Sequence, residues 1–189
     1  MVHYTLLLRG VNLGKENKVI MPVLKEQLAS IGLLQVDSYI NTGNLFFYSD
    51  RPKVDLVQSL ADLLQSQYDF EIPFVLLESS TIIEDADCLP HWWQEENYRC
   101  DALFYLPNCS KEMLADQLKA WQLGEEEYHI GETALFWRVA TKEHYTKTAH
   151  ARKIMTKPFN QAITLRNANT FNKIVARLQS RNGEVREQV

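Results

Sequence analysis

Two polar stretches of the chain hold the side chains best suited to binding an anion, and the first is a loop near the N-terminus. Arg9, Asn12 and Lys15 lie in this loop, which also contains Gly10 and Gly14. Backbone N–H groups of a loop that precedes a helix can cradle a phosphate or carboxylate, with help from cationic side chains. The spacing matches neither the Gly-x-x-x-x-Gly-Lys-Ser/Thr phosphate loop nor the Gly-x-Gly-x-x-Gly dinucleotide motif. The alternative is a structural loop, in which the glycines make turns and Asn12 bonds to the backbone.

The second polar stretch lies near the C-terminus, where Arg166 and Asn167 follow a β-rich run. Helix capping explains the nearby Asn169 or Thr170 but does not readily explain Arg166 and Asn167, for which a structural and a functional role are equally open. Arg9 and Arg166 each close a β-rich run and open a polar stretch, so we predict that they share one pocket at strand ends. Such a pocket suits a carboxylate or a phosphate. The predicted ligand-binding residues are Arg9, Asn12, Lys15, Asn44, Arg166 and Asn167.

A basic stretch offers an alternative site. Residues 133–182 hold ten Lys and Arg and one Glu, whereas residues 84–132 hold twelve Asp and Glu and three Lys and Arg. Phosphate neutralisation and aromatic stacking together hold single-stranded nucleic acid. Five cations interleaved with Tyr145 and Phe159 fit this pattern: Lys142, Lys147, Arg152, Lys153 and Lys157. The net charge of −4 and the missing RNA-recognition consensus oppose it, so we favour a basic helix face that pairs with the acidic middle segment.

Signatures of catalysis and of metal or cofactor binding are missing from the sequence. It contains no Gly-x-Ser-x-Gly elbow and no His-Glu-x-x-His motif. The three cysteines form no Cys-x-x-Cys pair, and the spacing of His144 and His150 does not place them one helical turn apart. The run Glu125 to Glu127 is typical of a solvated strand entrance rather than of an acid/base pair. We therefore expect no metal and no cofactor.

Composition places the chain among ordinary globular proteins. It has 189 residues, of which 46% are hydrophobic and 23% charged. No apolar run approaches the roughly 20 residues that cross a bilayer, and the N-terminus lacks the pattern of a secretory signal. An odd number of scattered cysteines does not form a disulfide framework. The sequence thus predicts a cytoplasmic protein that does not contact a membrane.

The first part of the chain has the pattern of a strand, helix, strand, strand, helix, strand unit. The apolar run from Val2 to Leu8 predicts a strand buried on both faces, and apolar residues at helical spacing follow Pro22 and Pro52. Turn formers at 41–44 predict a hairpin, which by itself accounts for Asn44. This order is typical of the ferredoxin-like fold.

The second part repeats the same pattern after an acidic connector. We predict an N-terminal ferredoxin-like unit over residues 1–78, an irregular connector over 79–99, and a C-terminal α+β unit over 100–189. Within the last of these, His144 to Met155 is the predicted second helix, and Asn169 is predicted to cap the final helix. The fold class is therefore α+β, with two βαββαβ units, antiparallel sheets and a C-terminal helix.

Three motifs resemble a bacterial family known as domain of unknown function 1697. They are the run Leu7 to Gly14, the run Tyr39 to Asn44, and the run Thr164 to Thr170. The chain differs from the family at Lys15, where glycine is frequent, and at Ala168, where tryptophan is frequent. The resemblance implies a shared fold and a cytoplasmic bacterial protein, and it implies no catalytic residue.

Three classes of function remain open from the sequence. We expect a non-enzymatic module that binds a small anionic ligand through Arg9, Arg166 and their neighbours. The alternative is nucleic-acid binding through Lys142 to Lys157, and an enzyme of unidentified reaction is the third. Salt dependence separates the first two, because binding through several phosphates weakens steeply as salt rises.

Overall fold

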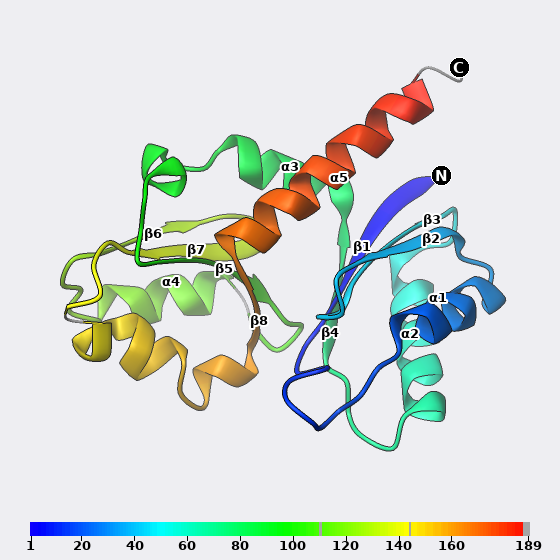
Figure 1. The fold of residues 1–189 in the computed structure, drawn as a ribbon, viewed down its shortest axis with the longest axis horizontal. Helices are drawn as coiled ribbons and strands as arrows, with labels where there is room; N and C mark the ends of the chain where they lie inside the picture. The colour runs from blue at the N-terminus through cyan, green and yellow to red at the C-terminus, as the bar shows by residue number, and fades with distance from the viewer. Residues whose placement is uncertain (110, 144, 187–189) are drawn as a thin grey trace. The chain divides into compact units, whose positions relative to one another are not determined.

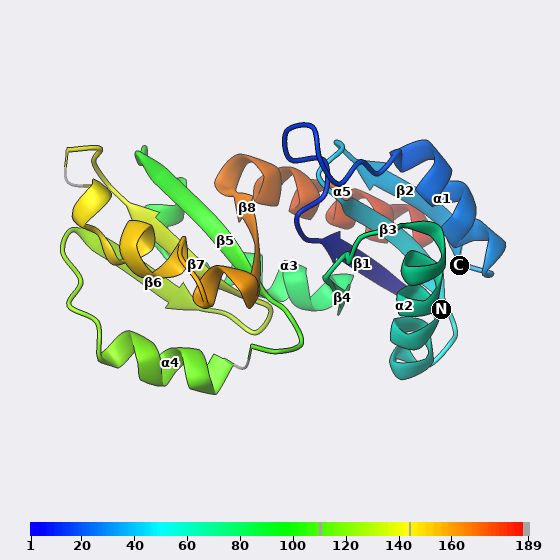
Figure 2. The same ribbon diagram turned by 90° about the horizontal axis from the view of Figure 1, so that it is seen from below.

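The protein consists of two compact units. The computed structural model describes residues 1–109, 111–143 and 145–186. Contacts along the chain divide it into unit 1, Met1–Ser80, and unit 2, Thr81–Val189. Each unit is built around its own four-stranded antiparallel sheet, as Figures 1 and 2 show.

Unit 1 has the strand order β2-β3-β1-β4, which is that of the ferredoxin-like fold. Leu6 in β1 lies opposite Leu45 in β3 and Leu76 in β4, so the centre of the sheet is apolar. Residues on both faces of β1 are buried, as its continuous apolar run predicts. The strands are β1 (Val2–Leu8), β2 (Leu34–Tyr39), β3 (Asn44–Ser49) and β4 (Phe74–Glu78).

Two helices of unit 1 share one core with its sheet. Helix α1 (Met21–Ser30) has a proline in its first turn, and α2 (Lys53–Gln67) begins directly after Pro52, where a fixed φ favours helix initiation. Their leucines at helical spacing pack against one face of β1 and β3. This core contains Leu6, Leu8, Leu24, Leu28, Leu45, Phe47, Leu56, Leu60 and Leu64.

Unit 2 repeats this order with β6-β7-β5-β8. Leu103 in β5 lies opposite Leu135 in β7 and Leu165 in β8. The strands are β5 (Arg99–Tyr105), β6 (Glu126–Ile130), β7 (Ala134–Val139) and β8 (Ile163–Asn167), and the helices that flank them are α4 (Lys111–Lys119) and α5 (Ala168–Arg186). The prediction of two ferredoxin-like α+β units with a C-terminal helix is confirmed.

The predicted irregular connector is ordered. It forms α3 (Ser79–Asp87) and the short 3₁₀ helix η1 (His91–Gln94). Trp93 in η1 packs edge-on against Phe136 and Phe171, whose ring centroids lie 5.3 and 5.4 Å away. Since Phe171 belongs to α5, the connector and the last helix together cover one face of the second sheet (Figure 1).

The predicted helix from His144 to Met155 is wrong for the residues that the structure describes, and His144 lies outside them. Three short helices occupy this part of the chain: η2 (Tyr145–Lys147), the π-helix η3 (His150–Ile154) and η4 (Phe159–Gln161). The backbone N–H groups of Ala149 and His150 donate to the carboxylate of Glu126 instead of to carbonyls one turn earlier. A side-chain acceptor from a neighbouring strand therefore interrupts the regular helix.

Gly43 generates a prediction for the hairpin of unit 1. It has φ +77°, and a Cβ built on it would lie 2.6 Å from Leu8 Cβ, whereas Gly32 has φ +87° and open space around it. Gly32→Ala should cost about 1 kcal/mol of stability for the left-handed backbone, and Gly43→Ala about 3 kcal/mol because of the added clash. Urea unfolding followed by circular dichroism measures both, and equal losses would contradict the packing argument.

Candidate functional site

The loop after β1 is held in shape by Asn12. Its Nδ2 donates to the carbonyls of Val19 (2.8 Å) and Asn41 (2.7 Å), and its Oδ1 accepts from the N–H of Val19 (3.0 Å). Asn12 and Asn17 both have positive φ, at 56° and 49°, a strained conformation that these bonds stabilise. The amide of Asn12 thus serves the loop itself, and Lys15 is exposed on it.

Arg9 and Asn44 lie at the same end of the first sheet, because β1 ends where β3 begins. Arg9 follows β1 and is half-buried, and its backbone N–H donates to the Pro73 carbonyl at 2.8 Å. Asn44 is fully buried, and its Nδ2 donates to the Tyr39 carbonyl and to Thr42 Oγ1, both at 3.0 Å. These bonds give Asn44 the hairpin role that its turn position predicts.

Arg166 and Asn167 end strand β8 in unit 2. Arg166 is 6% exposed and donates to Thr164 Oγ1 and the Leu165 carbonyl at 3.0 and 2.8 Å. Burial lowers the pKa of Arg166 to about 10, which keeps it charged at neutral pH. Asn167 Oδ1 accepts from the Thr170 N–H at 2.8 Å, so Asn167 caps α5 and the predicted cap at Asn169 is wrong. The pocket shared by Arg9 and Arg166 stays a prediction.

The five cations of the basic segment, by which we mean residues 142–157, are all exposed. None of them forms an ion pair with a described carboxylate; the acids of the middle segment pair elsewhere, Glu95 and Glu127 with Arg138 and Glu132 with Lys111. Arg138, which does pair with the acidic segment, also belongs to the basic stretch 133–182. The favoured interpretation, that a basic helix face pairs with the acidic segment, therefore stays a prediction for the five cations, which form no such ion pair within 1–109, 111–143 and 145–186. The cations concerned are Lys142, Lys147, Arg152, Lys153 and Lys157.

A buried glutamate fixes the basic segment to the sheet. Glu126 is 5% exposed, and its carboxylate accepts from Ala149 N (2.8 Å), His150 N (2.9 Å) and Trp137 Nε1 (3.1 Å). The prediction that this stretch of glutamates is a solvated strand entrance is wrong for Glu126, although Glu125 and Glu127 are exposed. Only one feature of the sequence indicated that Glu126 is buried: strand side chains alternate between faces, which places Glu126 on the same face of β6 as Tyr128.

A second buried carboxylate ties the same segment to β5. Asp101 is 1% exposed, and its Oδ2 lies 2.6 Å from Arg99 Nε and 3.0 Å from His150 Nε2. The other ring nitrogen of His150, Nδ1, lies 3.1 Å from Tyr145 Oη. Four side chains therefore form one hydrogen-bonded chain that ends at the half-buried Tyr145. The spacing of Asp101 and His150 in the sequence gave no sign of this contact.

Two tyrosines and an arginine lie beside the basic segment. Tyr98, which is 44% exposed, packs edge-on against Tyr145 with ring centroids 5.4 Å apart. The Arg99 guanidinium lies 5.7 Å from the centre of the Tyr145 ring. The Tyr98 N–H donates to the Ala140 carbonyl at 3.0 Å, so Tyr98 lies next to the chain that leads into Lys142. The arrangement combines exposed cations with an exposed aromatic ring.

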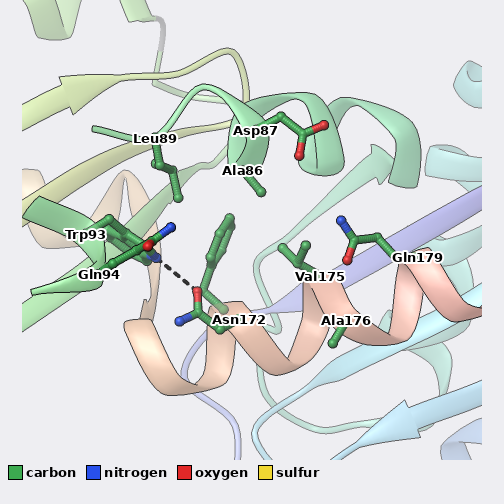
Figure 3. Close-up of a pocket in the computed structure, with 10 residues that line it drawn as sticks. Ala86, Asp87, Leu89, Trp93, Gln94, Asn172, Val175, Ala176 and Gln179 are labelled. Atoms are coloured by element: carbon green, nitrogen blue, oxygen red, sulfur yellow. Dashed lines mark hydrogen bonds between the residues drawn. The ribbon is translucent and has the colours of Figure 1, made fainter. Parts of the chain in front are cut away.

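A separate groove of about 540 Å³ runs between α5 and the connector of unit 2 (Figure 3). Apolar and polar side chains both line it, and Trp93 Nε1 donates to Asn172 Oδ1 at 2.9 Å. Asp87 is its one ionisable lining residue, so the groove does not suit an anion. The lining residues are Ala86, Asp87, Leu89, Trp93, Gln94, Phe171, Asn172, Val175, Ala176 and Gln179.

The described part of the chain offers no site of metal-ligand type and no membrane-spanning helix. It contains no group of three or more His, Cys, Asp or Glu placed to hold a metal ion. None of its helices is both long and apolar enough to cross a bilayer. Cys88, Cys100 and Cys109 are free thiols.

Comparisons with known proteins identify relatives of the fold and of the sequence. The family model described as "Protein of unknown function (DUF1697)" matches residues 1–136, which include the first two motifs of the sequence resemblance. A solved structure, that of the conserved bacterial protein SP0830 from Streptococcus pneumoniae, is 37% identical with a TM-score of 0.87. The match covers 94% of this chain and 98% of that one. A search of curated proteins finds no match.

Glu126 generates a prediction about the anchoring of the basic segment. Glu126→Gln keeps the side-chain shape but turns an NH₂ group toward at least one of the three N–H donors, which have no other partner among the described residues, and this should cost about 2 to 3 kcal/mol. Trp92, Trp93, Trp121 and Trp137 are the four tryptophans and all lie in unit 2, so tryptophan fluorescence in urea measures this unit. Glu125→Gln, at an exposed neighbour, is the control and should change stability little.

Proposed function

The chain belongs to the DUF1697 family of proteins of unknown function, and on this premise we propose that it binds single-stranded nucleic acid through the basic segment of unit 2. One observation supports the proposal above the others. Five exposed cations lie within the basic segment, and no described carboxylate pairs with them. Unpaired, exposed cations close in sequence attract a ligand with several phosphates.

The neighbouring tyrosines supply the second part of single-strand binding. A base can stack on an exposed aromatic ring whatever its sequence, and cations beside the ring hold the phosphates. Tyr98 is exposed, and it is supported from behind by its edge-on contact with Tyr145. Cationic and aromatic contacts would thus come from neighbouring parts of unit 2.

The anchoring of the segment favours binding because it reduces the entropy lost when a ligand binds. Segments that must become ordered on binding lose affinity to the entropy of ordering. Here Glu126 bonds to the backbone of Ala149 and His150, and Asp101 bonds to the His150 ring. Lys147 and Arg152 flank these anchored residues, so their backbone is already positioned.

A small anionic ligand is the second candidate function. The observation that favours it is the loop after β1, which Asn12 holds in a strained shape with Lys15 exposed on it. Arg9, Asn44, Arg166 and Asn167 remain the other residues proposed for that ligand. We also infer a cytoplasmic location, supported by the three free thiols.

Binding to a fluorescent single-stranded oligonucleotide at several salt concentrations tests the first candidate. Lys147→Ala should weaken binding and make the slope of log K against log salt shallower by roughly 0.7, the loss expected for one phosphate contact. Lys53→Ala, which removes an exposed cation from unit 1, is the control and should leave both unchanged. Fluorescence anisotropy measures both quantities.

The outcome of the titration separates the candidates. No binding at low salt, or an equal effect of Lys53→Ala, would contradict the basic segment as a nucleic-acid site. Phosphate or a mononucleotide could instead bind with an affinity that changes little with salt. If Arg9→Ala abolishes this binding and Lys147→Ala does not, the result would support the small-ligand candidate.

Tyr98 generates a separate prediction about stacking. Tyr98→Ala should weaken oligonucleotide binding by about 1 to 3 kcal/mol, or roughly 5- to 150-fold, without changing the salt slope. Tyr98→Phe keeps the ring and should bind as the wild type does. Equal losses in the two variants would show that the hydroxyl, rather than stacking, matters at this position.

A further inference from the structure

Tyr145 is the outer end of a hydrogen-bonded chain whose proton positions are set by Asp101. A carboxylate only accepts hydrogen bonds, so His150 Nε2, 3.0 Å from Asp101 Oδ2, carries a proton and donates it. In the neutral imidazole Nδ1 is then the acceptor, and Tyr145 Oη, 3.1 Å away, is the donor. The order of groups is that of a Ser-His-Asp triad, with a phenol in the place of the serine hydroxyl and with the two ring nitrogens exchanged.

Tyr145 needs such a base in order to react as a nucleophile, because its surroundings keep the phenol protonated. Burial raises the pKa of Tyr145, although the charge of Arg99 acts in the opposite direction, so the phenolate is scarce at neutral pH. A phenol in this state reacts well only if a neighbouring base takes its proton during the attack, an effect that contributes about 10²- to 10⁴-fold. His150 is in place to do so, and Asp101 stabilises the imidazolium that results.

The π-helix adds an independent observation. His150 opens η3, and π-helical turns are rare and frequently occur at functional sites. Its backbone is fixed by Glu126 and its ring by Asp101, so neither the ring nor its Nδ1 is free to turn away from Tyr145. This rigidity is what a base needs in order to stay aligned with its nucleophile.

We propose that Tyr145 is a nucleophilic site that accepts a phosphoryl group from an activated phosphate ester. Tyr145 Oη forms a bond to phosphorus while the bond from phosphorus to the leaving oxygen breaks. The phenolic proton moves to His150 Nδ1 and then to the leaving oxygen, which departs as an alcohol. Arg99, 5.7 Å from the ring centre, and the exposed Lys147 attract the phosphate. The site goes beyond oligonucleotide binding and does not depend on it.

Two neighbouring side chains do not compete for this role. Burial, followed by the charge of Asp101, raises the pKa of Cys100 to about 12, which leaves its thiol protonated at neutral pH. Tyr98 is more exposed than Tyr145, and within the described residues its hydroxyl has no bond to a histidine. Tyr98 is therefore a matched phenol in the same molecule, near the same cations but without the base.

Site-resolved labelling of the full chain tests the proposal. Diisopropyl fluorophosphate at neutral pH transfers its phosphoryl group to a nucleophilic oxygen and releases fluoride. Peptide mass spectrometry over time measures the labelling rates of Tyr145 and Tyr98 in the same sample. We expect Tyr145 to react at least about tenfold faster, from the contribution of a positioned base. Equal rates, a faster Tyr98, or no label on Tyr145 would overturn the proposal.

Two variants separate the base from simple exposure. Asp101→Asn keeps the shape of the side chain but removes the charge that stabilises the imidazolium, and in folded protein it should lower the Tyr145 rate about tenfold or more. An unchanged rate would overturn the proposal. If Asp101→Asn does not fold, the comparison of the two tyrosines in wild-type protein still decides. Tyr98→Phe should leave the Tyr145 label unchanged, and loss of that label would show that the proposed relay is not its cause.

Discussion

Buried carboxylates must find hydrogen-bond donors, and unit 2 is arranged around three that do. An unpaired buried charge would be very costly, so the position of each acid determines what packs against it. Asp85 accepts from the N–H groups of Glu132 and Thr133, both at 2.7 Å, and thereby fixes α3 to the β6–β7 hairpin. Glu126 and Asp101 fix the chain around His150 to the other face of the sheet. Most of the donors are backbone amides, the Thr133 hydroxyl or the His150 ring, each from a distant part of the sequence. The Arg99 guanidinium and the Trp137 indole lie closer, 2 and 11 residues from their acceptors Asp101 and Glu126. These contacts, rather than helix propensity, give residues 145–161 their shape.

The fold was predictable because its signals are local. Apolar runs such as Val2 to Leu8 have the length of strands, Pro22 and Pro52 mark helix starts, and turn formers precede Asn44. Each of these features acts within a few residues, so the order of elements followed from reading along the chain. The prediction of a regular second helix in unit 2 failed because the disruption of that helix is not local. The residue that interrupts it, Glu126, lies 23 and 24 positions before its backbone partners Ala149 and His150.

The site was predictable only in part, for the same reason. The basic segment was visible as a cluster of charge, whereas its lack of ion pairs depended on where Glu95, Glu127 and Glu132 found their partners. Glu126 stands between two acids of the same type, and strand alternation alone distinguishes its buried side chain from theirs. Asn12 and Asn44 show the opposite case. Backbone bonding was predicted for Asn12 and a hairpin position for Asn44, and the structure gives both amides backbone partners.

The two units have the same topology and differ most in the connection between their last two strands. In unit 1 this connection is the regular helix α2, whose apolar stripe of Leu56, Leu60 and Leu64 packs on the sheet. In unit 2 it is the broken segment of η2, η3 and η4, fixed by two carboxylates instead of by a continuous stripe. A helix held by leucines would be simpler to build and would need no buried acid, since buried ion pairs add little stability beyond what apolar contacts give. The broken segment differs from a regular helix in that its backbone is fixed at only a few residues, with exposed cations between them. It also carries Tyr145, which is hydrogen-bonded to the buried His150. The departure from regular structure therefore falls where the polar chemistry of the molecule is gathered, which is why we place function in unit 2.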